Sequence, residues 1–381
     1  MKKQNLQEDI SQLAAVLEDK DFSSINAVIG VDGFVDEIIH VVDTRETVED
    51  YTRLKTINSF GERILKAAGL STNIELVPVQ VKLGGNGPIL ANALVEYGNN
   101  VTYVGALGNP SIHPVFRDMA DRCTEIISVA NPGHTDAVEF EDGKLMLGKL
   151  ESLKDINWDN IKKQIDIEEM AELLDSTDLL GLENWTMVPF MNGIWEGLIE
   201  EVFPLMKDGE KRRIAFFDLA DPEKRTNEAI KEALNILERF SPQFNVILGL
   251  NKKEAIEIAE VLGIKVKNLA TGDVDLEELT TKVAEELDIY CLVVHPVDRA
   301  SAYCDGEYFE TVGPYTPNPK LTTGAGDNFN AGFCLAQSLG LPVQLSLVMG
   351  TATSGFYVRN AKSPTKEGIL EFLDSWSSET A

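Results

Sequence analysis

The sequence has little cysteine, and the cysteines it has form no recognisable motif. Cys123, Cys291, Cys304 and Cys334 are the only four in 381 residues, and no two of them make a C-x-x-C pair. A zinc site or a C-x-x-C redox centre is therefore not predicted. Cys291 lies in the apolar run IYCLVVH and is expected in the core. This cysteine usage indicates a reducing, cytoplasmic compartment.

Long hydrophobic runs are also missing. No apolar run approaches the roughly 20 residues that a membrane helix needs, so no membrane partner is expected. The segment 1–20 begins with two lysines but lacks the apolar stretch of a signal peptide. Leu6, Ile10, Leu13 and Leu17 instead recur at three- and four-residue steps, which predicts an amphipathic helix.

Positive charge is scarce. The chain has 34 lysines and arginines against 62 acidic residues, a net charge of −28. A field of that sign repels nucleic acid and anionic lipid, so neither is expected as a partner. It also repels nucleotides at long range, so a phosphate site would have to be built locally from backbone N–H groups or a metal ion. The alternative is that the charge serves solubility alone.

Two common nucleotide signatures are absent. The sequence contains no G-x-x-x-x-G-K-[ST], which excludes a P-loop protein. No G-x-G-x-x-G opens the first strand–helix unit, so the dinucleotide-binding fingerprint is missing too.

Short apolar segments alternate with helical patterns along the chain. This alternation predicts one α/β domain spanning 1–381, with a doubly wound, mostly parallel sheet flanked by helices. Strands are predicted at 25–31, 101–107, 124–130, 178–184, 213–219, 245–250 and 289–295. Helices are predicted at 87–97, 190–206, 226–240, 252–262 and 275–287.

Two regions have a different periodicity. Residues 73–83 and 135–150 alternate apolar and polar side chains, and EDG at 141–143 indicates a hairpin turn. We expect a small β lid set apart from the main sheet. The alternative is an edge hairpin of that sheet. Residues 49–69, just before the first region, are predicted to be a helical insertion.

The stretch PKLTTGAGDNFNAGF, residues 319–333, carries the strongest chemical signal. Phe329 and Phe333 open a helical pattern, which places Asp327 in the first turn after Gly324, Ala325 and Gly326. Small residues there leave N–H groups open to an anion, and the carboxylate can take a proton from a hydroxyl. The alternative is that Asp327 only caps a helix after a glycine turn.

Three further segments carry candidate site residues. Gly84 and Gly85 let the backbone approach a ligand closely, or form a tight turn. Asn251 and Glu254 form N-x-x-E after a strand, which fits either a hydrated Mg²⁺ site or a helix capping box. Asp32 and Asp36 follow the first strand and could accept hydrogen bonds from polyol hydroxyls, or lie in a solvated turn.

In this order, the motifs resemble those of the PfkB (ribokinase-like) carbohydrate kinase family over nearly the whole chain. TTGAGDNFNAGF resembles the family signature D-T-x-G-A-G-D-x-F-x-x-G. GGNG with LANALVEYG is similar to its N-terminal signature, NKKE to its N-x-x-E motif, and DPEKR at 221–225 to its D-P-x-x-R segment.

The resemblance implies transfer of the γ-phosphoryl group of ATP to a hydroxyl of a sugar or nucleoside, beneath a β lid. Carried over by position, the base is Asp327, and the anion hole is made by Gly324, Ala325 and Gly326. The sugar pocket is Asp32, Asp36, Gly84, Gly85 and Asn86. The nucleotide contacts are Thr323, His295 and Asn251, and Mg²⁺ lies at Asn251 and Glu254, through water.

The chain departs from the family pattern at three places. Leu321 stands where the signature begins with an aspartate, which removes an oxygen ligand for an activating monovalent cation such as potassium. Pro88 and Ile89 stand where an asparagine is usual. HPVDRAS at 295–301 replaces the T-x-G-x-x-G nucleotide loop, with Val297 and Ala300 at glycine positions.

The sequence therefore predicts a Mg²⁺- and ATP-dependent sugar kinase with Asp327 as its base. A nucleoside kinase is the alternative substrate class. The altered loop at 295–301 also leaves open a kinase-fold protein that binds sugar or nucleotide for regulation, with little turnover. The period-two segment AVEFE, 137–141, could pair two lids in a homodimer.

Overall fold

Nine strands form the central sheet of the structure, a computed structural model that describes residues 3–207 and 213–380. In chain order they are β1 (Asn26–Val31), β5 (Asn100–Gly105), β6 (Glu125–Ser128), β9 (Leu179–Leu182), β10 (Ile214–Asp218), β11 (Asn245–Leu250), β12 (Cys291–Val294), β13 (Arg299–Cys304) and β14 (Glu307–Val312). Their order across the sheet is β14-β13-β12-β11-β10-β9-β1-β5-β6. All pairs from β6 to β12 are parallel, and the pairs β12–β13 and β13–β14 are antiparallel.

The strand order reverses at the centre of this sheet. From β1 the chain goes to β5 and β6 on one side, and then returns as β9 on the other side of β1. In doubly wound sheets, ligands bind beside such a reversal, at the carboxyl ends of the strands. The residues that follow β1, β9, β10 and β11 are therefore the first candidates for ligand binding.

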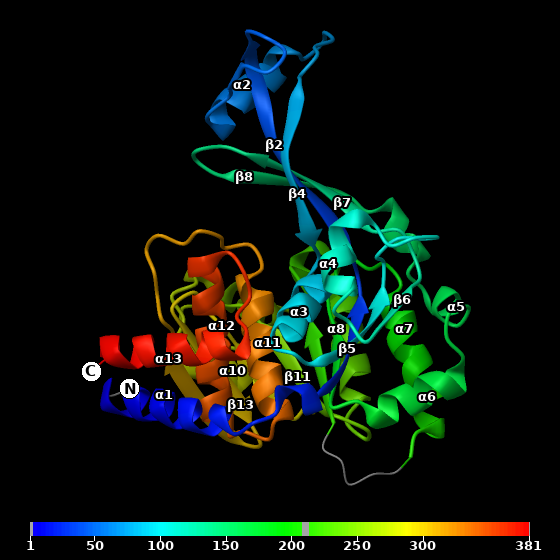
Figure 1. Ribbon diagram of the computed structural model, residues 1–381, viewed down its shortest axis with the longest axis vertical. Coiled ribbons are helices and arrows are strands. Elements are labelled where there is room, and N and C mark those ends of the chain that lie inside the picture. Colours follow the sequence, from blue (N-terminus) through cyan, green and yellow to red (C-terminus); the bar gives the residue numbers. More distant parts are fainter. Residues whose placement is uncertain (1–2, 208–212, 381) are drawn as a thin grey trace.

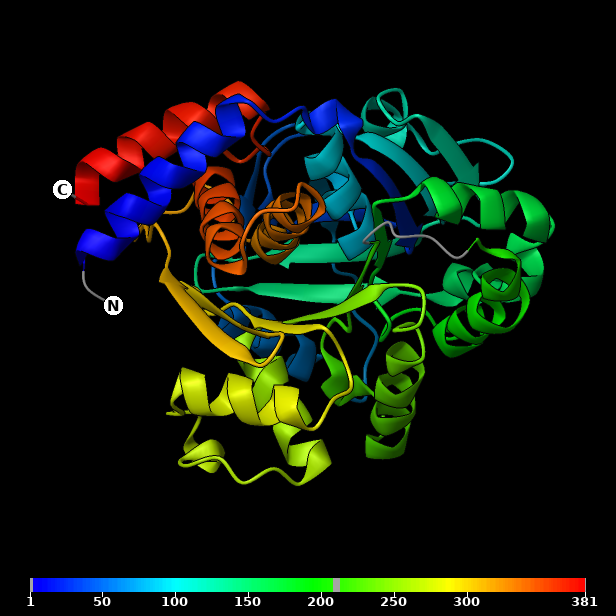
Figure 2. The ribbon, with the colours of Figure 1, turned by 90° about the horizontal axis from the view of Figure 1, so that it is seen from below.

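Helices cover both faces of the sheet, as Figure 2 shows. One face carries α1 (Lys3–Glu18), α3 (Asn86–Glu96), α11 (Ala325–Ser338), α12 (Val343–Asn360) and α13 (Lys366–Thr380). The other carries α6 (Ile167–Ser176), α7 (Met191–Gly197), α8 (Asn227–Glu238), α9 (Lys252–Leu262) and α10 (Leu276–Glu285). Adjacent strand residues such as Phe216 and Phe217 point to opposite faces, so each face has its own core. The predicted fold class is confirmed.

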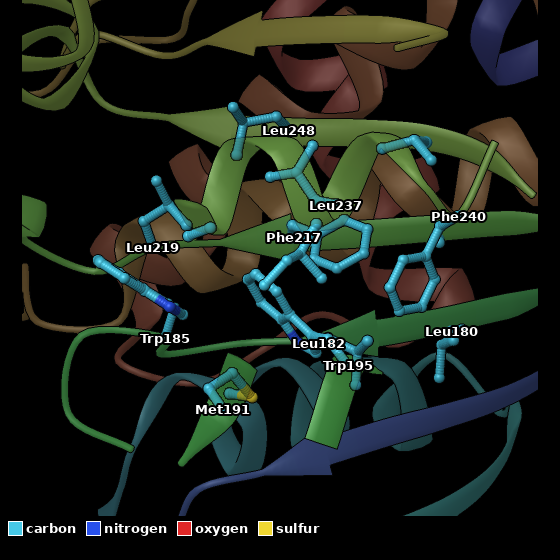
Figure 3. Close-up of a cluster of buried hydrophobic side chains, with 14 of the residues drawn as sticks. Leu180, Leu182, Trp185, Met191, Trp195, Phe217, Leu219, Leu237, Phe240 and Leu248 are labelled. Carbon is cyan, nitrogen blue, oxygen red and sulfur yellow. The ribbon is translucent and has the colours of Figure 1, made fainter. Parts of the chain in front are cut away.

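Aromatic rings fill the core between β10 and helices α7 and α8 (Figure 3). The ring of Phe217 lies 5.1 Å from that of Trp195 and 5.0 Å from that of Phe240, both edge to face. All three side chains are fully buried. Edge-to-face pairs at this separation add to the stabilisation from burial.

The predicted elements of the main body agree with the structure, with two differences. All seven predicted strands are present, and so is the amino-terminal helix. The predicted helix 190–206 is composite: α7 continues as a π-helical turn, Leu198–Val202, and a 3₁₀ turn, Phe203–Leu205. The antiparallel strands β13 and β14 were not predicted, because they follow the altered loop rather than a helix.

A second sheet projects from the body, at the top of Figure 1. It comprises β2 (Phe34–Arg45), β3 (Tyr51–Arg53), β4 (Leu76–Gly84), β7 (Gly133–Glu139) and β8 (Lys144–Lys149). Strands β4, β7 and β8 occur in the two period-two regions. They belong to a sheet of their own, so the alternative of an edge hairpin of the main sheet is wrong.

The long strand β2 was missed by the sequence analysis. Seven of its first nine residues are buried, and their side chains point alternately to both faces of the sheet. The strand therefore lacks the alternation of apolar and polar residues that marked β4 and β7. The predicted helical insertion at 49–69 is also partly wrong. Only α2, Ile57–Lys66, is helical, and residues 51–53 form β3. Phe60 of α2 packs on Phe140 and Val41, which gives the lid a small core.

Cys291 is buried in β12 as predicted, and it has a partner that the sequence did not indicate. It lies directly opposite Cys304 of β13, and the two sulfurs form a disulfide. Their separation in the chain matches no motif, so only the strand register brings them together. The reducing, cytoplasmic location stays a prediction. Over the described ranges, no helix is both long enough and apolar enough to cross a bilayer.

Candidate active site

Polar side chains converge at the carboxyl ends of the central strands. Asp32 follows β1, Asn184 follows β9, Asp221 follows β10 and Asn251 follows β11. Asn184, Ala220 and Asp221 all have left-handed backbone conformations, which non-glycine residues adopt rarely. Such conformations concentrate at functional sites, where surrounding contacts hold them in place.

A cavity of about 590 Å³ lies between this edge of the sheet and the lid. Its walls include residues of the lid, of the loops after β9 and β10, and of the first turn of α11. Among them are Phe34, Asp36, Thr135, Met146, Gly85, Asn86, Asn184, Asp221, Lys224, Glu254, Thr323, Gly324 and Asp327. The mixture of apolar walls and polar groups suits a small polyhydroxyl ligand.

A second cavity of about 360 Å³ lies on the other side of the α11 N-terminus. Its walls include Asn251, His295, Arg299, Tyr315, Thr322, Ala325, Gly326 and Phe329. The two cavities share the first turn of α11 as a wall: Gly324 and Asp327 face the first cavity, Ala325 and Gly326 the second. Two ligands, one in each cavity, would therefore meet at this turn.

The first turn of α11 depends on glycine. Gly324 has φ +90°, and a Cβ there would come within 2.9 Å of the Tyr357 hydroxyl. The helix has no side-chain cap, which leaves its N-terminal dipole open to an anion. The Ala325 N–H, part of the predicted anion hole, already donates to the Thr322 carbonyl oxygen at 3.1 Å. It is therefore less available to an anion than an N–H group without a partner.

Asp327 is 7% exposed, at the boundary of the two cavities. Burial raises its pKa to about 8, and the nearby carboxylate of Asp32 adds to the increase, while a hydrogen bond from the Asn86 side chain opposes it. A raised pKa means that Asp327, once deprotonated, binds a proton more strongly than an exposed aspartate does. The geometry and basicity both suit removal of a proton from a hydroxyl in the first cavity.

Asp32 follows β1 and is held by the start of α3. Its carboxylate accepts hydrogen bonds from the Asn86 N–H (3.1 Å), the Gly87 N–H (2.9 Å) and the Asn184 side chain (2.6 Å). It is fully buried behind the wall of the first cavity, and burial raises its pKa to about 6. Gly85, with φ +94°, allows this approach, since a Cβ there would lie 2.8 Å from the carboxylate. Asp32 thus anchors the start of α3, and its predicted sugar contact stays a prediction.

Asp36 and Gly84 come from the lid. They lie on neighbouring strands, β2 and β4, and a Cβ at Gly84 would collide with the Asp36 carboxylate. Asp36 faces the first cavity and is 5% exposed. Burial raises its pKa, and Lys82 and a hydrogen bond from Thr135 lower it. The lid therefore presents one carboxylate to whatever occupies this cavity.

Asn251 and Glu254 form the capping box that the sequence analysis left as an alternative. The Asn251 side chain accepts from the Glu254 N–H at 3.0 Å, and Glu254 accepts from the Asn251 N–H at 2.8 Å. The other oxygen of Glu254 accepts from the Asp221 N–H at 3.0 Å. Asn251 faces the second cavity and Glu254 the first. Each oxygen keeps a lone pair, so the pair fits a Mg²⁺ ion held through water.

His295 and Thr323 were both predicted to contact the nucleotide. His295 lines the second cavity and stacks on Phe329 at 4.8 Å between ring centroids. Burial lowers its pKa to about 4, so the imidazole is neutral at pH 7. Thr323 lines the first cavity, and its neighbour Thr322 lines the second.

In the altered loop, 295–301, Val297 is 92% exposed, and Ala300 is buried in β13.

Sequence reasoning missed Lys224, Asn184 and Glu183. Lys224 brings a positive charge to the first cavity and pairs with Asp221 at 3.1 Å. It lies within DPEKR, which could have signalled it. Glu183 and Asn184 directly follow β9, a position that marks them only once the strand order is known. Burial and the carboxylates of Asp218 and Asp327 raise the pKa of Glu183.

Arg225, the last residue of DPEKR, has a structural role. Its guanidinium donates to the backbone carbonyl oxygens of Thr186, Trp185 and Val188 and stacks over the Trp185 ring. It thereby holds the loop after β9 against the loop after β10. Asn184 and Lys224, which both line the first cavity, lie in these two loops.

A doubly wound sheet with a β lid, and two cavities meeting at a glycine turn and one aspartate, define the class of ribokinase-like carbohydrate kinases. Solved structures share this fold. Thermotoga maritima ribokinase is 18% identical, with a TM-score of 0.62 over 92% of this chain and 99% of its own. Arabidopsis thaliana ribokinase, complexed with ribose and ATP, is 15% identical, with a TM-score of 0.61 over 92% of this chain and 98% of its own.

Sequence comparison defines the family more narrowly. The model of the prokaryotic ketohexokinase family matches residues 8–376. A ketohexokinase from Haloferax volcanii is 30% identical over 352 residues, which cover 92% of this chain and 91% of the relative. The chain belongs to the prokaryotic ketohexokinase family, and it is an ATP-dependent carbohydrate kinase.

Proposed function

We propose that this kinase phosphorylates a ketohexose, with Asp327 as the general base. The observation that carries the proposal is the meeting of the two cavities at the first turn of α11, with Asp327 on the sugar side and Gly326 on the other. The family and the Haloferax volcanii relative support the sugar class. A cavity of about 590 Å³ is also large enough for a hexose.

In this mechanism ATP occupies the second cavity and the sugar the first. Asp327 accepts the hydroxyl proton as the sugar oxygen attacks the γ-phosphorus, and ADP leaves with the electrons of the broken P–O bond. The Gly326 N–H and the α11 dipole stabilise the charge on the transferred group. Asn86 orients Asp327, and Asp36 and Lys224 face the sugar hydroxyls.

Mg²⁺ is proposed at Asn251 and Glu254, held through water. When bound, it would neutralise charge on the phosphates. The residues suit it, because their oxygens lie at the boundary of the two cavities. A local positive field of this kind is needed in a protein with a net charge of −28.

The test is ADP release with ATP and Mg²⁺ across ketohexoses, aldohexoses, pentoses and nucleosides. We expect kcat/KM for the best ketohexose to exceed that for every aldohexose by about 10-fold or more, a difference of about 1.4 kcal/mol in transition-state binding. The Asp327→Asn protein, prepared identically, controls for contaminating kinases. A higher value for a nucleoside would contradict the sugar proposal. Tight ligand binding without turnover would instead support the regulatory alternative.

We also propose that two chains associate through their lids. Within the described residues, β4 pairs only with β2, which leaves one edge of the lid sheet open. Val79 and Val81 of this edge strand are 46% and 48% exposed. Exposed apolar edge strands are prone to pair with a second chain. The segment 137–141, predicted to make this pairing, is not available: residues 137–139 end β7, which lies between β2 and β8.

Replacing both Val79 and Val81 by lysine is expected to convert the dimer to a monomer, because two charges on the edge oppose strand pairing. Sedimentation velocity at matched concentrations measures the change. Leu205→Lys is the control, since this side chain is 50% exposed on the body rather than the lid. A wild-type chain that sediments as a monomer at all concentrations would rule out the dimer.

A further inference from the structure

Three buried carboxylates converge beneath the active site. Glu183 follows β9, Asp218 ends β10 and Asp327 lies in the first turn of α11. One oxygen from each side chain lies within 4.8 Å of the other two. Glu183 and Asp218 do not line either cavity, whereas Asp327 lines the first. The cluster is therefore an inner group that reaches the sugar cavity through Asp327 alone.

Glu183 lacks the contacts that a buried carboxylate normally has. It is 0% exposed, and neither of its oxygens has a hydrogen-bond partner within the described parts of the chain. Its backbone is fixed, because its N–H donates to the Gly30 carbonyl oxygen at 2.9 Å. Leaving a buried acid without a partner is strongly unfavourable, which points to a ligand that the protein chain itself does not supply.

Asp218 accepts a hydrogen bond on each of its two carboxylate oxygens. One oxygen accepts from the Ala220 N–H at 2.8 Å, and the other from the Asn330 side chain at 3.1 Å. Burial and the carboxylates of Glu254 and Asp327 raise the pKa of Asp218, and these two hydrogen bonds oppose the increase. The amide oxygen of Asn330 has no partner within the described residues, so another oxygen ligand lies beside the cluster.

The charges that act on the cluster are negative. Glu183 is influenced by Asp218, Asp327 and Asp32, and Asp218 by Asp327 and Glu254. Like charges at this separation in a low-dielectric interior repel strongly. Hard divalent cations bind oxygen ligands at about 2.0–2.6 Å, which places neighbouring ligand oxygens roughly 3–5 Å apart. Three carboxylate oxygens that lie within 4.8 Å of one another can therefore bind a single ion of this kind.

We propose that Glu183, Asp218 and Asp327 form an inner site for a hard divalent cation, Mg²⁺ or Mn²⁺, distinct from the proposed nucleotide-linked site at Asn251 and Glu254. The ion would enter through the sugar cavity, where Asp327 is accessible. It would balance the buried charge and bind one oxygen of Asp327, which leaves the other oxygen to accept the hydroxyl proton. The site does not depend on which sugar is the substrate.

The test is Mn²⁺ binding to the full-length protein without nucleotide or sugar, measured by electron paramagnetic resonance of the free ion. We expect one tight Mn²⁺ per chain. Glu183→Gln should weaken it by at least about 10-fold, the loss typical even for residues that only support a metal ligand. Glu254→Gln is the matched control, since it makes the same change at the other site and should alter this affinity far less than Glu183→Gln does.

Two further measurements make the test decisive. Asp218→Asn serves as a second variant should Glu183→Gln fail to fold, and circular dichroism checks each protein. Anomalous diffraction at the manganese edge should place the ion between Glu183, Asp218 and Asp327. The proposal would be overturned if no Mn²⁺ bound in the absence of nucleotide, or if Glu254→Gln rather than Glu183→Gln abolished Mn²⁺ binding. It would also be overturned if Glu183→Gln weakened sugar binding but kept the wild-type Mn²⁺ affinity. None of these results depends on the outcome of the sugar panel.

Discussion

Replacing Asp327 by asparagine is expected to lower kcat by about 10²–10⁴-fold, the contribution typical of a general base. Asparagine has nearly the same shape but cannot accept the hydroxyl proton. Because the surrounding cavity is unchanged, the KM values for sugar and ATP should change far less than kcat. Coupled measurement of ADP release over a range of both substrates separates the two effects.

The control for this substitution is Asp275→Asn. Asp275 is an exposed N-cap residue whose carboxylate accepts from the Glu278 N–H at 2.9 Å, so it has a capping role far from both cavities. We expect its loss to leave kcat unchanged. If Asp327→Asn retained wild-type kcat, Asp327 would be a helix-capping residue, which is the alternative that the sequence left open.

Truncating Phe217 to alanine is expected to lower the free energy of unfolding by about 3–5 kcal/mol. The ring is 0% exposed and contacts Trp195 and Phe240 edge to face, as Figure 3 shows. Its removal leaves a cavity that the strand β10 and helices α7 and α8 can close only partly. Equilibrium unfolding in urea, followed by tryptophan fluorescence and circular dichroism, measures the change.

Phe190→Ala is the matched control, because Phe190 is 49% exposed just before α7. Its truncation should change the free energy of unfolding by less than about 1 kcal/mol. Similar losses for the two variants would show that the rings in Figure 3 are not packed as tightly as the structure describes.

The position of Phe217 also connects the core to the active site. The next residue, Asp218, ends β10, and the loop that follows carries Asp221 and Lys224 into the first cavity. A core that fixes β10 therefore fixes the acid cluster and the cavity wall. Loss of packing at Phe217 is expected to disturb catalysis as well as stability.

The arrangement explains how an acidic protein can handle anionic substrates. The net charge of −28 lies mostly on the surface, while the second cavity offers backbone N–H groups and the N-terminal dipole of α11. Lys224 adds a positive charge at the first cavity. Phosphate binding thus depends on a few local groups, as expected from the shortage of basic residues.

Local patterns in the sequence sufficed to predict the seven strands of the main sheet, the lid strands with alternating residues and the segment around Asp327. These signals are local. Short apolar runs between helical patterns predict parallel strands, and small residues before an acid predict an open helix N-terminus, whatever the rest of the chain does.

Which distant side chains meet depends on how the elements pack together. Glu183, Asp218 and Asp327 come together because β9 and β10 are neighbours and α11 begins above their carboxyl ends. The same holds for Cys291 with Cys304, and for Asp32, which accepts hydrogen bonds from the start of α3. Strand β2 escaped prediction because burial on both faces removed its alternation. Contacts of this kind depend on strand order and register, which no single segment of the sequence encodes.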